Sequence, residues 1–349
     1  MDNIWQIHDI KMTDKLTLSK VGELLKSVNL KQDIIDECAV IYDENENVIA
    51  TVSRYLNTLK CLAIDRHYQG NNLANKLVTY MIQKIYQQGW NEVFVFTKPD
   101  YFGVFQQLGF NIIYQNNNFA FLTNRYDLFK NYLDYLAKEK NNHRYASVIV
   151  MNANPFTKGH WYLVQQASLQ SDFVYIIPVK EQGSLFNYQE RKKMIEQGVQ
   201  EFKNVKVLEG SNYLVSKNVF PAYFLPSPQA VISEQTNLDA HIFVDYIAKA
   251  LQVTTRFVGD EPYSTTTNEY NKMMATVFAA NHFNLVIIPR LTFNNHAISA
   301  TTARKLFITG DFEQLQAIVP WSTFNFLKKL DYLSYQKIPN IKALIEKDY

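Results

Sequence analysis

Cysteine and net charge are both scarce in this sequence. Two cysteines, Cys38 and Cys61, occur among 349 residues, and neither has the spacing of a metal ligand. This excludes a disulfide framework and favours buried free thiols in a reducing compartment. The 35 basic and 33 acidic residues leave a formal charge of +2, which gives no general attraction for a polyanion. We therefore expect no nucleic-acid partner.

Long apolar runs are also missing. The longest, such as FVYIIPV, have the length of a strand and cannot cross a membrane. The N-terminal sequence MDNIWQIHDIKMTDK lacks the apolar centre of a signal peptide. Hydrophobic residues nevertheless make up 47% of the chain, which is typical of a packed globular protein. We expect a soluble, cytoplasmic protein with no membrane partner, and the length predicts two domains.

The first part of the chain predicts a mixed sheet with helices packed on it. Strand patterns occur at 38–43, 48–56, 58–64 and 92–97, with helical patterns at 18–28 and 72–88. A helix at 126–138 and the polar stretch KEKNNHR follow. We predict a domain over residues 1–124, then a linker helix and linker over residues 125–145.

From residue 146 the pattern changes to buried strands that alternate with helices. Apolar strands are predicted at 147–151, 173–179, 254–259 and 284–289, and helices at 160–169, 188–199 and 269–280. Such alternation is typical of a doubly wound parallel sheet. The predicted class is α/β, with a mixed sheet first and a parallel sheet over residues 146–349.

The stretch VIVMNANPFTKGHWYL places Gly159 and His160 where the first of these later strands turns into a helix. A helix N-terminus offers unpaired N–H groups and the positive end of the helix dipole, which suit a phosphate. A glycine lets the backbone approach a ligand, and a histidine adds a directional donor. Ligands of α/β sheets bind at this end of a strand. A plain link with a capping histidine would show the same pattern.

Two motifs resemble those of the nucleotidyltransferase superfamily. NPFTKGH resembles its His-x-Gly-His signature, with Thr157 in place of the first histidine, and ISATTAR resembles its Ile-Ser-Ser-Thr-x-x-Arg motif. The resemblance implies ATP as the nucleotide, with Mg²⁺ to neutralise the triphosphate, and His160 and Arg304 as catalytic residues. It implies phosphate contacts from Asn154, Phe156, Thr157, Gly159, His160, Ser299, Thr301 and Arg304.

The stretch IDRHYQGNNLANKL resembles the first motif of the GNAT family of N-acetyltransferases, whose backbone amides hold the pyrophosphate of coenzyme A. Gln69, Gly70 and Ala74 fit that motif, and Asn72 replaces its central glycine. Asparagine tolerates unusual backbone angles better than most residues. In FQQLGF, Phe105 stands where that fold often has a tyrosine acid, and it cannot give a proton. The resemblance implies that these loop residues bind a coenzyme A-like arm without acetyl transfer.

The order of these parts, with YFLPS and VGDEPYSTTTNEYN between them, resembles the citrate (pro-3S)-lyase ligase family over nearly the whole chain. That resemblance implies activation of acetate by ATP, giving acetyl-AMP and pyrophosphate. The acetyl group then passes to the prosthetic-group thiol on the acyl carrier subunit of citrate lyase. Two alternatives remain: a nucleotidyltransferase making a dinucleotide cofactor with a fused acetyltransferase, and a non-catalytic sensor of acetyl-CoA or ATP.

Five charged residues outside the main motifs have less certain roles. Lys158 and Lys180 either contact phosphate or another ligand or are solvated, and Arg191 is expected at the surface or in a salt bridge. Asp260 and Glu261 end another strand, where a polar loop and a substrate or metal contact are equally compatible with the sequence. We predict no specific metal-ligating residue.

Overall fold

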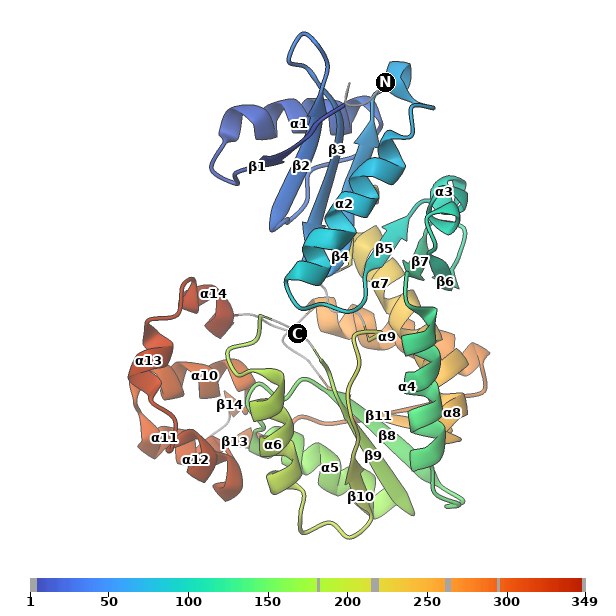
Figure 1. Ribbon diagram of the computed structural model, residues 1–349. Helices are drawn as coiled ribbons and strands as arrows, with labels where there is room; N and C mark the ends of the chain where they lie inside the picture. Colours follow the sequence, from blue (N-terminus) through green and yellow to red (C-terminus); the bar gives the residue numbers. More distant parts are fainter. Residues whose placement is uncertain (1–4, 181–182, 215–219, 261–264, 294–295, 347–349) are drawn as a thin grey trace. The chain divides into compact units, whose positions relative to one another are not determined.

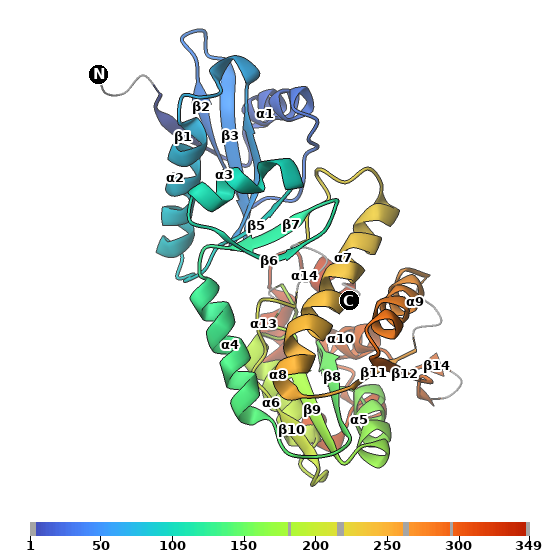
Figure 2. The same ribbon diagram turned by 90° about the vertical axis from the view of Figure 1, so that its right-hand side faces the viewer.

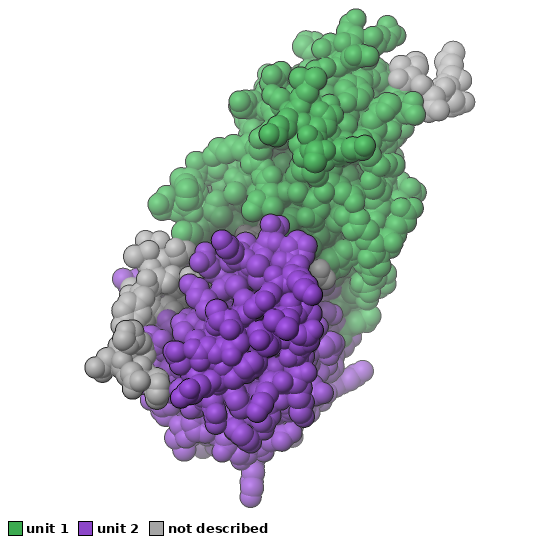
Figure 3. Space-filling view, turned by 90° about the vertical axis from the view of Figure 1, so that its left-hand side faces the viewer, with its two compact units in different colours: residues 1–131, 216–238 green, residues 132–215, 239–349 purple. Residues whose placement is uncertain are grey.

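The structure is a computed structural model that describes residues 5–180, 183–214, 220–260, 265–293 and 296–346 (Figure 1). The chain forms two compact units (Figure 3). Unit 1 comprises Met1–Asn131 and Ser216–Leu238, and unit 2 comprises Tyr132–Val215 and Asp239–Tyr349. Residues 216–238 thus group with unit 1, although they lie within the stretch predicted as the second domain. Among the described residues, no helix has the length and apolar character needed to cross a membrane.

Unit 1 is built on a mixed sheet, as predicted, and this sheet has seven strands. Its strands are β1 (Ile7–Ile10), β2 (Glu37–Tyr42), β3 (Val48–Tyr55), β4 (Thr58–Ile64), β5 (Phe94–Thr97), β6 (Asn111–Gln115) and β7 (Ala120–Thr123). Their spatial order is β1-β2-β3-β4-β5-β7-β6. Neighbouring strands are antiparallel except β4 and β5, which run parallel. These two strands pair only at Thr58 with Phe94 and at Leu59 with Val95 before they separate.

Helices α1 (Lys15–Ser27) and α2 (Leu73–Gln87) cover opposite faces of this sheet (Figure 2). The alternation of side chains along β2 shows the two faces: Ala39 and Ile41 belong to the core beneath α2, whereas Cys38 and Val40 belong to the core beneath α1. The remaining helices that begin in unit 1 are η1 (Arg66–Tyr68), η2 (Pro99–Tyr101), α3 (Phe102–Gln107), α4 (Tyr126–Glu139) and α7 (Pro228–Ile242).

The late segment of unit 1 packs where β4 and β5 separate. Tyr223 is buried, and its hydroxyl donates to the carbonyl oxygen of Phe96 on β5 at 3.1 Å. The N–H of Lys31 donates to the carbonyl oxygen of Tyr223 at 2.7 Å. The N–H of Ala222 donates to the Asp33 carboxylate at 3.3 Å. Two distant parts of the sequence therefore complete the core of unit 1.

Unit 2 contains the predicted doubly wound parallel sheet. Its strands are β8 (Ala146–Met151), β9 (Phe173–Pro178), β10 (Val205–Val207), β11 (Thr255–Gly259) and β12 (Asn284–Ile288). Their order is β10-β9-β8-β11-β12, and every neighbouring pair is parallel. A small antiparallel pair, β13 (Thr292–Phe293) and β14 (His296–Ala297), precedes α10. The apolar runs of the central strands are explained by helices on both faces.

Two groups of helices cover this sheet. One face carries α5 (Lys158–Gln170), α6 (Tyr188–Gly198), α10 (Ala300–Thr309), α11 (Phe312–Ile318), α12 (Trp321–Leu327), α13 (Tyr332–Gln336) and α14 (Ile341–Glu346). The other carries the π-helical turn η3 (Phe243–Ala248), α8 (Lys249–Leu251) and α9 (Thr265–Ala280). Strand β11 shows the division, because Phe257 joins the core of the first group while Arg256 lies over the Phe243 ring, 4.8 Å from its centre.

Candidate functional site

The loop between β8 and α5 brings the predicted hinge to the carboxyl edge of the parallel sheet. β8 ends at Met151, and Ala153 in the following turn has a φ of 48°, in the left-handed region. The peptide bond between Asn154 and Pro155 is cis. Because β8 is central, with β9 on one side and β11 on the other, its carboxyl end lies where a doubly wound sheet offers a ligand crevice.

Thr157 and His160 form a capping box at the start of α5. Thr157 Oγ1 accepts the N–H of His160 at 3.4 Å, and His160 Nδ1 accepts the N–H of Thr157 at 3.0 Å. A ring nitrogen that accepts a hydrogen bond carries no proton, so the neutral imidazole holds its proton on Nε2. The capping box therefore fixes both the ring orientation and the identity of the donor atom.

The electrostatic setting keeps His160 uncharged. Desolvation of the half-buried His160 lowers its pKa from 6.5 to about 4, and the nearby charges of Arg290 and Arg304 act in the same direction. The ring also stacks on Phe156, with 5.8 Å between centroids. At neutral pH His160 can donate to a phosphate as an uncharged imidazole, while Arg290 and Arg304 provide positive charge near its ring.

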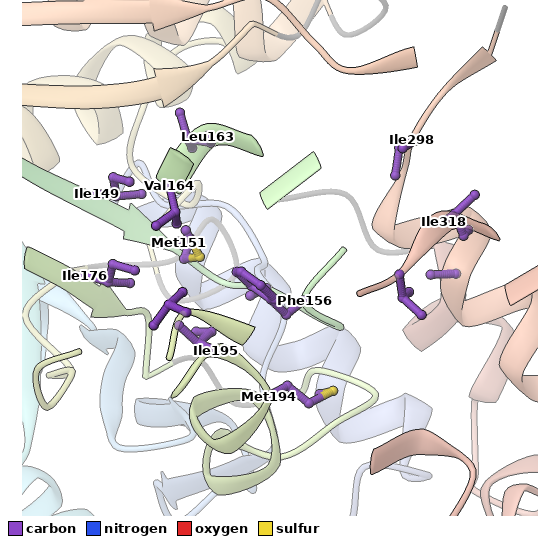
Figure 4. Close-up of a cluster of buried hydrophobic side chains, with 14 of the residues drawn as sticks. Ile149, Met151, Phe156, Leu163, Val164, Ile176, Met194, Ile195, Ile298 and Ile318 are labelled. Atoms are coloured by element: carbon purple, nitrogen blue, oxygen red, sulfur yellow. The ribbon is translucent and has the colours of Figure 1, made fainter. Parts of the chain in front are cut away.

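Phe156 anchors the loop in the core. Its fully buried side chain belongs to the same apolar cluster as Met151 and Ile195 (Figure 4). Gly198 in α6 makes room for it, since a Cβ at that position would lie 2.4 Å from the Phe156 ring. Any contact of Phe156 with a nucleotide is therefore limited to its backbone.

Gly159 lies where the two predicted nucleotide motifs meet. A Cβ on this residue would be 3.7 Å from the carbonyl oxygen of Ile298 and 3.5 Å from Thr157 Oγ1, which are ordinary contact distances. Among the described residues, no neighbour requires a glycine here on steric grounds. The absence of a side chain instead leaves the start of α5 open to the approach of a ligand.

The second motif begins α10, and each of its predicted residues contacts the chain itself. Ser299 caps the helix with its hydroxyl. Arg304 is 1% exposed, and its guanidinium donates to the carbonyl oxygen of Asn154 at 2.6 Å, to Thr301 Oγ1 at 2.9 Å and to the carbonyl oxygen of Ile345 at 2.9 Å. Arg304 thus joins two motifs that lie 150 positions apart in the sequence. Its phosphate contact stays a prediction.

Two arginines at this edge were not among the predicted site residues. Arg290 follows β12, and its Nε donates to the carbonyl oxygen of Ile298 at 3.3 Å. The sequence offered one indication of this position, because Arg290 comes just after a predicted strand of the parallel sheet. Arg191 was expected at the surface or in a salt bridge, and the surface alternative is wrong: the residue is fully buried, and its Nη1 donates to the carbonyl oxygens of Asn152 and Val179, each at 2.9 Å.

The other charged residues take different positions. Lys158 donates to a backbone carbonyl in α11 at 2.7 Å, and the Lys180 ammonium lies over the Tyr188 ring at 5.7 Å. Asp260 follows β11, and Glu261 lies outside the described residues. Within the described ranges, no group of three histidine, cysteine or acidic side chains could hold a metal ion.

In unit 1, residues 69–72 of the predicted loop form an exposed turn in front of α2, and Ala74 lies in the first turn of that helix. Gly70 and Asn72 both have left-handed backbones, with φ of 87° and 58°. No described side chain caps α2 at Asn72, so the N–H groups of its first turn are not paired by a cap. Phe105 is buried and packs edge-to-face on Phe110, with 5.9 Å between centroids.

These features define a two-unit α/β protein, in which a mixed-sheet unit is joined to a parallel-sheet unit whose central strand leads into a helix start suited to a phosphate. The family model for the citrate lyase ligase C-terminal domain matches residues 146–327. Over 324 residues the chain is 35% identical to the citrate (pro-3S)-lyase ligase of Haemophilus influenzae, covering 91% of this chain and 97% of that protein. The corresponding enzyme of Klebsiella pneumoniae is 34% identical, with coverages of 93% and 96%. The chain belongs to the citrate (pro-3S)-lyase ligase family.

Two further similarities are partial. A phosphopantetheine adenylyltransferase of Streptococcus agalactiae is 36% identical over 78 residues, or 21% of this chain and 48% of that protein. An acetyltransferase of the GNAT family from Staphylococcus aureus superposes on 34% of this chain and 98% of its own, with 14% identity and a TM-score of 0.29.

Proposed function

We propose that this chain activates acetate with ATP and then acetylates the prosthetic-group thiol on the acyl carrier subunit of citrate lyase. In the first step an acetate oxygen bonds to the α-phosphorus, and the bond from that phosphorus to the bridging oxygen breaks, releasing pyrophosphate. In the second step the thiol sulfur bonds to the acetyl carbon, AMP leaves, and the thiol proton passes to solvent. The names of the full-length relatives support the general role, the activation of citrate lyase.

The meeting of the two motifs at the start of α5 is the observation that carries this proposal. At the start of α5, the Nε2–H of His160 and the positive end of the helix dipole can both interact with a phosphate. The charges of Arg290 and Arg304 lie near the same ring. Negative charge grows on the α-phosphate and the departing pyrophosphate as the bond breaks. Donors and cations fixed in advance at that position would lower the barrier. Mg²⁺ bound to the triphosphate would neutralise further charge.

For unit 1 we propose binding of the coenzyme A-like arm of the prosthetic group, without acetyl transfer. The open loop Gln69–Ala74 supports binding because backbone N–H groups without a side-chain cap can meet a pyrophosphate. Phe105 has no proton to donate, which argues against acetyl transfer by this unit. The gap between β4 and β5 is also filled by Tyr223 of the chain itself. Having both functions on one chain would raise the effective concentration of the thiol near acetyl-AMP.

The extent of the family similarity favours this proposal over the two alternatives. It covers more than nine-tenths of the chain, whereas the adenylyltransferase similarity covers 21%. A dinucleotide-forming enzyme would require a pocket for a second nucleotide. A sensor would bind ATP or acetyl-CoA without turnover.

The test is to incubate the purified protein with ATP, Mg²⁺ and labelled acetate, with and without the thiol form of the carrier. We expect acetyl-AMP and pyrophosphate in the absence of carrier, and transfer of label to the thiol after carrier is added. Folded protein that releases no acetate-dependent pyrophosphate would contradict the proposal. Acetylation of the carrier from acetyl-CoA by the same protein would instead assign acetyl transfer to unit 1.

A further inference from the structure

The turn after β8 combines an unfavourable backbone with hydrogen bonds from two buried arginines. Ala153 has a φ of 48°, a left-handed conformation that is unfavourable for a non-glycine residue. Arg304 donates to the carbonyl oxygen of Asn154 at 2.6 Å. On the other side of Ala153, Arg191 Nη1 donates to the carbonyl oxygen of Asn152 at 2.9 Å and to its Oδ1 at 2.6 Å. One guanidinium therefore binds each end of the turn.

Arg191 also connects this turn to two neighbouring segments. Its Nη1 donates to the carbonyl oxygen of Val179, just after β9, and its Nε donates to the carbonyl oxygen of Phe186 at 3.1 Å. The N–H of Phe186 in turn donates to Asn154 Oδ1 at 3.1 Å. The contacts form a closed circuit at the carboxyl edge of the sheet, with a fully buried cation in it.

Stability alone is a poor explanation for this arrangement. A buried charge must recover a large desolvation cost, and apolar replacements of buried charged groups are often neutral or stabilising. Within the described residues, the Nδ2 groups of Asn152 and Asn154 are also buried without a hydrogen-bond partner. Strained backbone persists only where its surroundings impose it, and such residues concentrate at functional sites. The turn therefore combines several costs directly before α5.

We propose that Arg191 is a positioning residue for the ATP-dependent step. By holding the turn on the Asn152 side, it sets the direction in which the first turn of α5 and His160 Nε2–H face the phosphates. This inference rests on the proposed function. Arg191 acts through the backbone and makes no contact with the nucleotide. A displacement of about 1 Å in a reacting group can cost about 100-fold in rate, so a loosened turn should affect turnover strongly.

Kinetics of Arg191→Lys provide the test. Lysine keeps the charge but not the planar set of donors. We expect the kcat for acetate-dependent pyrophosphate release to fall by about 10- to 100-fold, while the KM for ATP changes less than about threefold. Adding Ala153→Gly should restore most of the kcat, because glycine adopts this φ without penalty. Arg54→Lys is the matched control: Arg54 is 4% exposed in unit 1, so its replacement should lower the Tm and leave kcat unchanged.

A folded Arg191→Lys protein with a kcat within about twofold of the wild type would overturn the inference. So would a loss of kcat that Ala153→Gly does not restore. If the lysine variant does not fold, Asn152→Ala removes the Oδ1 acceptor of Arg191 at a half-buried residue. We expect a several-fold loss of kcat in this variant, and an unchanged kcat would overturn the inference. Wild-type protein without acetate-dependent pyrophosphate release would defeat the proposed function as well, which distinguishes the two failures.

Discussion

The two helices that begin at predicted ligand loops start in opposite ways. In unit 2, Thr157 and His160 cap the first turn of α5. In unit 1, α2 begins after Asn72, which has a left-handed backbone and gives no side-chain cap. Both helices face the same requirement, because the first four N–H groups of any helix lack a partner within it.

This contrast suggests two uses of a helix N-terminus. A capped terminus is stable without a ligand, and the cap in α5 fixes one donor, His160 Nε2–H, in one direction. Directed donors suit a transition state, whose charge must be met at a fixed position. An uncapped, exposed terminus leaves several N–H groups to the ligand, which suits binding of a pyrophosphate. The predictions below test whether chemistry and binding divide between α5 and α2 in this way.

The largest expected effect is on turnover in His160→Ala. Removal of one donor to a developing charge costs about 100- to 1,000-fold in kcat. We expect a loss of that size in acetate-dependent pyrophosphate release, with a much smaller change in ATP affinity. His67→Ala is the control, because His67 is an exposed histidine close to the α2 loop. Equal pyrophosphate release by both variants and the wild type would remove His160 from the chemistry.

The second prediction concerns stability in acid. The pKa of His160 is lowered from 6.5 to about 4 in the folded protein, mainly by burial, so between these values the unfolded chain binds more protons. The associated stability is complete above pH 6.5 and is lost as pH falls toward 4, by up to about 3 kcal/mol. Urea unfolding at pH 7 and pH 4.5 should show a smaller loss for His160→Gln than for the wild type. Identical losses would contradict the lowered pKa.

The third prediction concerns Gly70 at the open terminus. Valine at a φ of 87° would strain the loop by about 1–2 kcal/mol and disturb its N–H groups. We expect carrier acetylation by Gly70→Val to fall about tenfold, while acetate-dependent pyrophosphate release stays within about twofold. Gly89→Val is closely matched, since Gly89 ends the same helix with a φ of 88° and a Cβ there also meets nothing within 4 Å.

For Gly70→Val and Gly89→Val, the rates of carrier acetylation and of pyrophosphate release are compared together with the Tm. Gly89→Val should lose a similar amount of stability and keep carrier acetylation, because its strain lies at the far end of α2. A similar loss of acetylation in both variants would attribute the effect to destabilisation of unit 1. The proposed binding role of the loop would then lose its support.

Local pattern was enough to predict most of the sheets. β8 and β9 are buried on both faces and therefore appear as continuous apolar runs, and α2 has a regular amphipathic repeat. The return of residues 216–238 to unit 1 was not predictable in this way. The hydrogen bond from Tyr223 to Phe96 joins residues 127 positions apart, and neither neighbourhood encodes the other.

The candidate site shows the same limit. Gly159 and His160 were recognisable because a strand, a turn and a helix follow one another directly in the sequence. The inward direction of Arg304 and the burial of Arg191 depend on carbonyl groups at the ends of β8 and β9, which only the folded sheet brings together. A helical charge pattern contains no information about such partners.

The smallest expected effect, and the one that separates fold from ligand most directly, is that of Gly159→Ala. In the folded chain the new Cβ would meet only ordinary contacts, the nearest at 3.5 Å. Alanine is also the better helix former by about 0.5–1 kcal/mol, so the variant should be slightly more stable in urea unfolding than the wild type. If a nucleotide approaches the start of α5 closely, the same methyl group should raise the KM for ATP several-fold. Gly103→Ala in α3, where the added Cβ meets nothing within 4 Å, should leave that KM unchanged. A more stable Gly159→Ala protein with an unchanged KM would show that the glycine serves neither the fold nor the nucleotide, and the approach proposed for the phosphates at α5 would have to be abandoned.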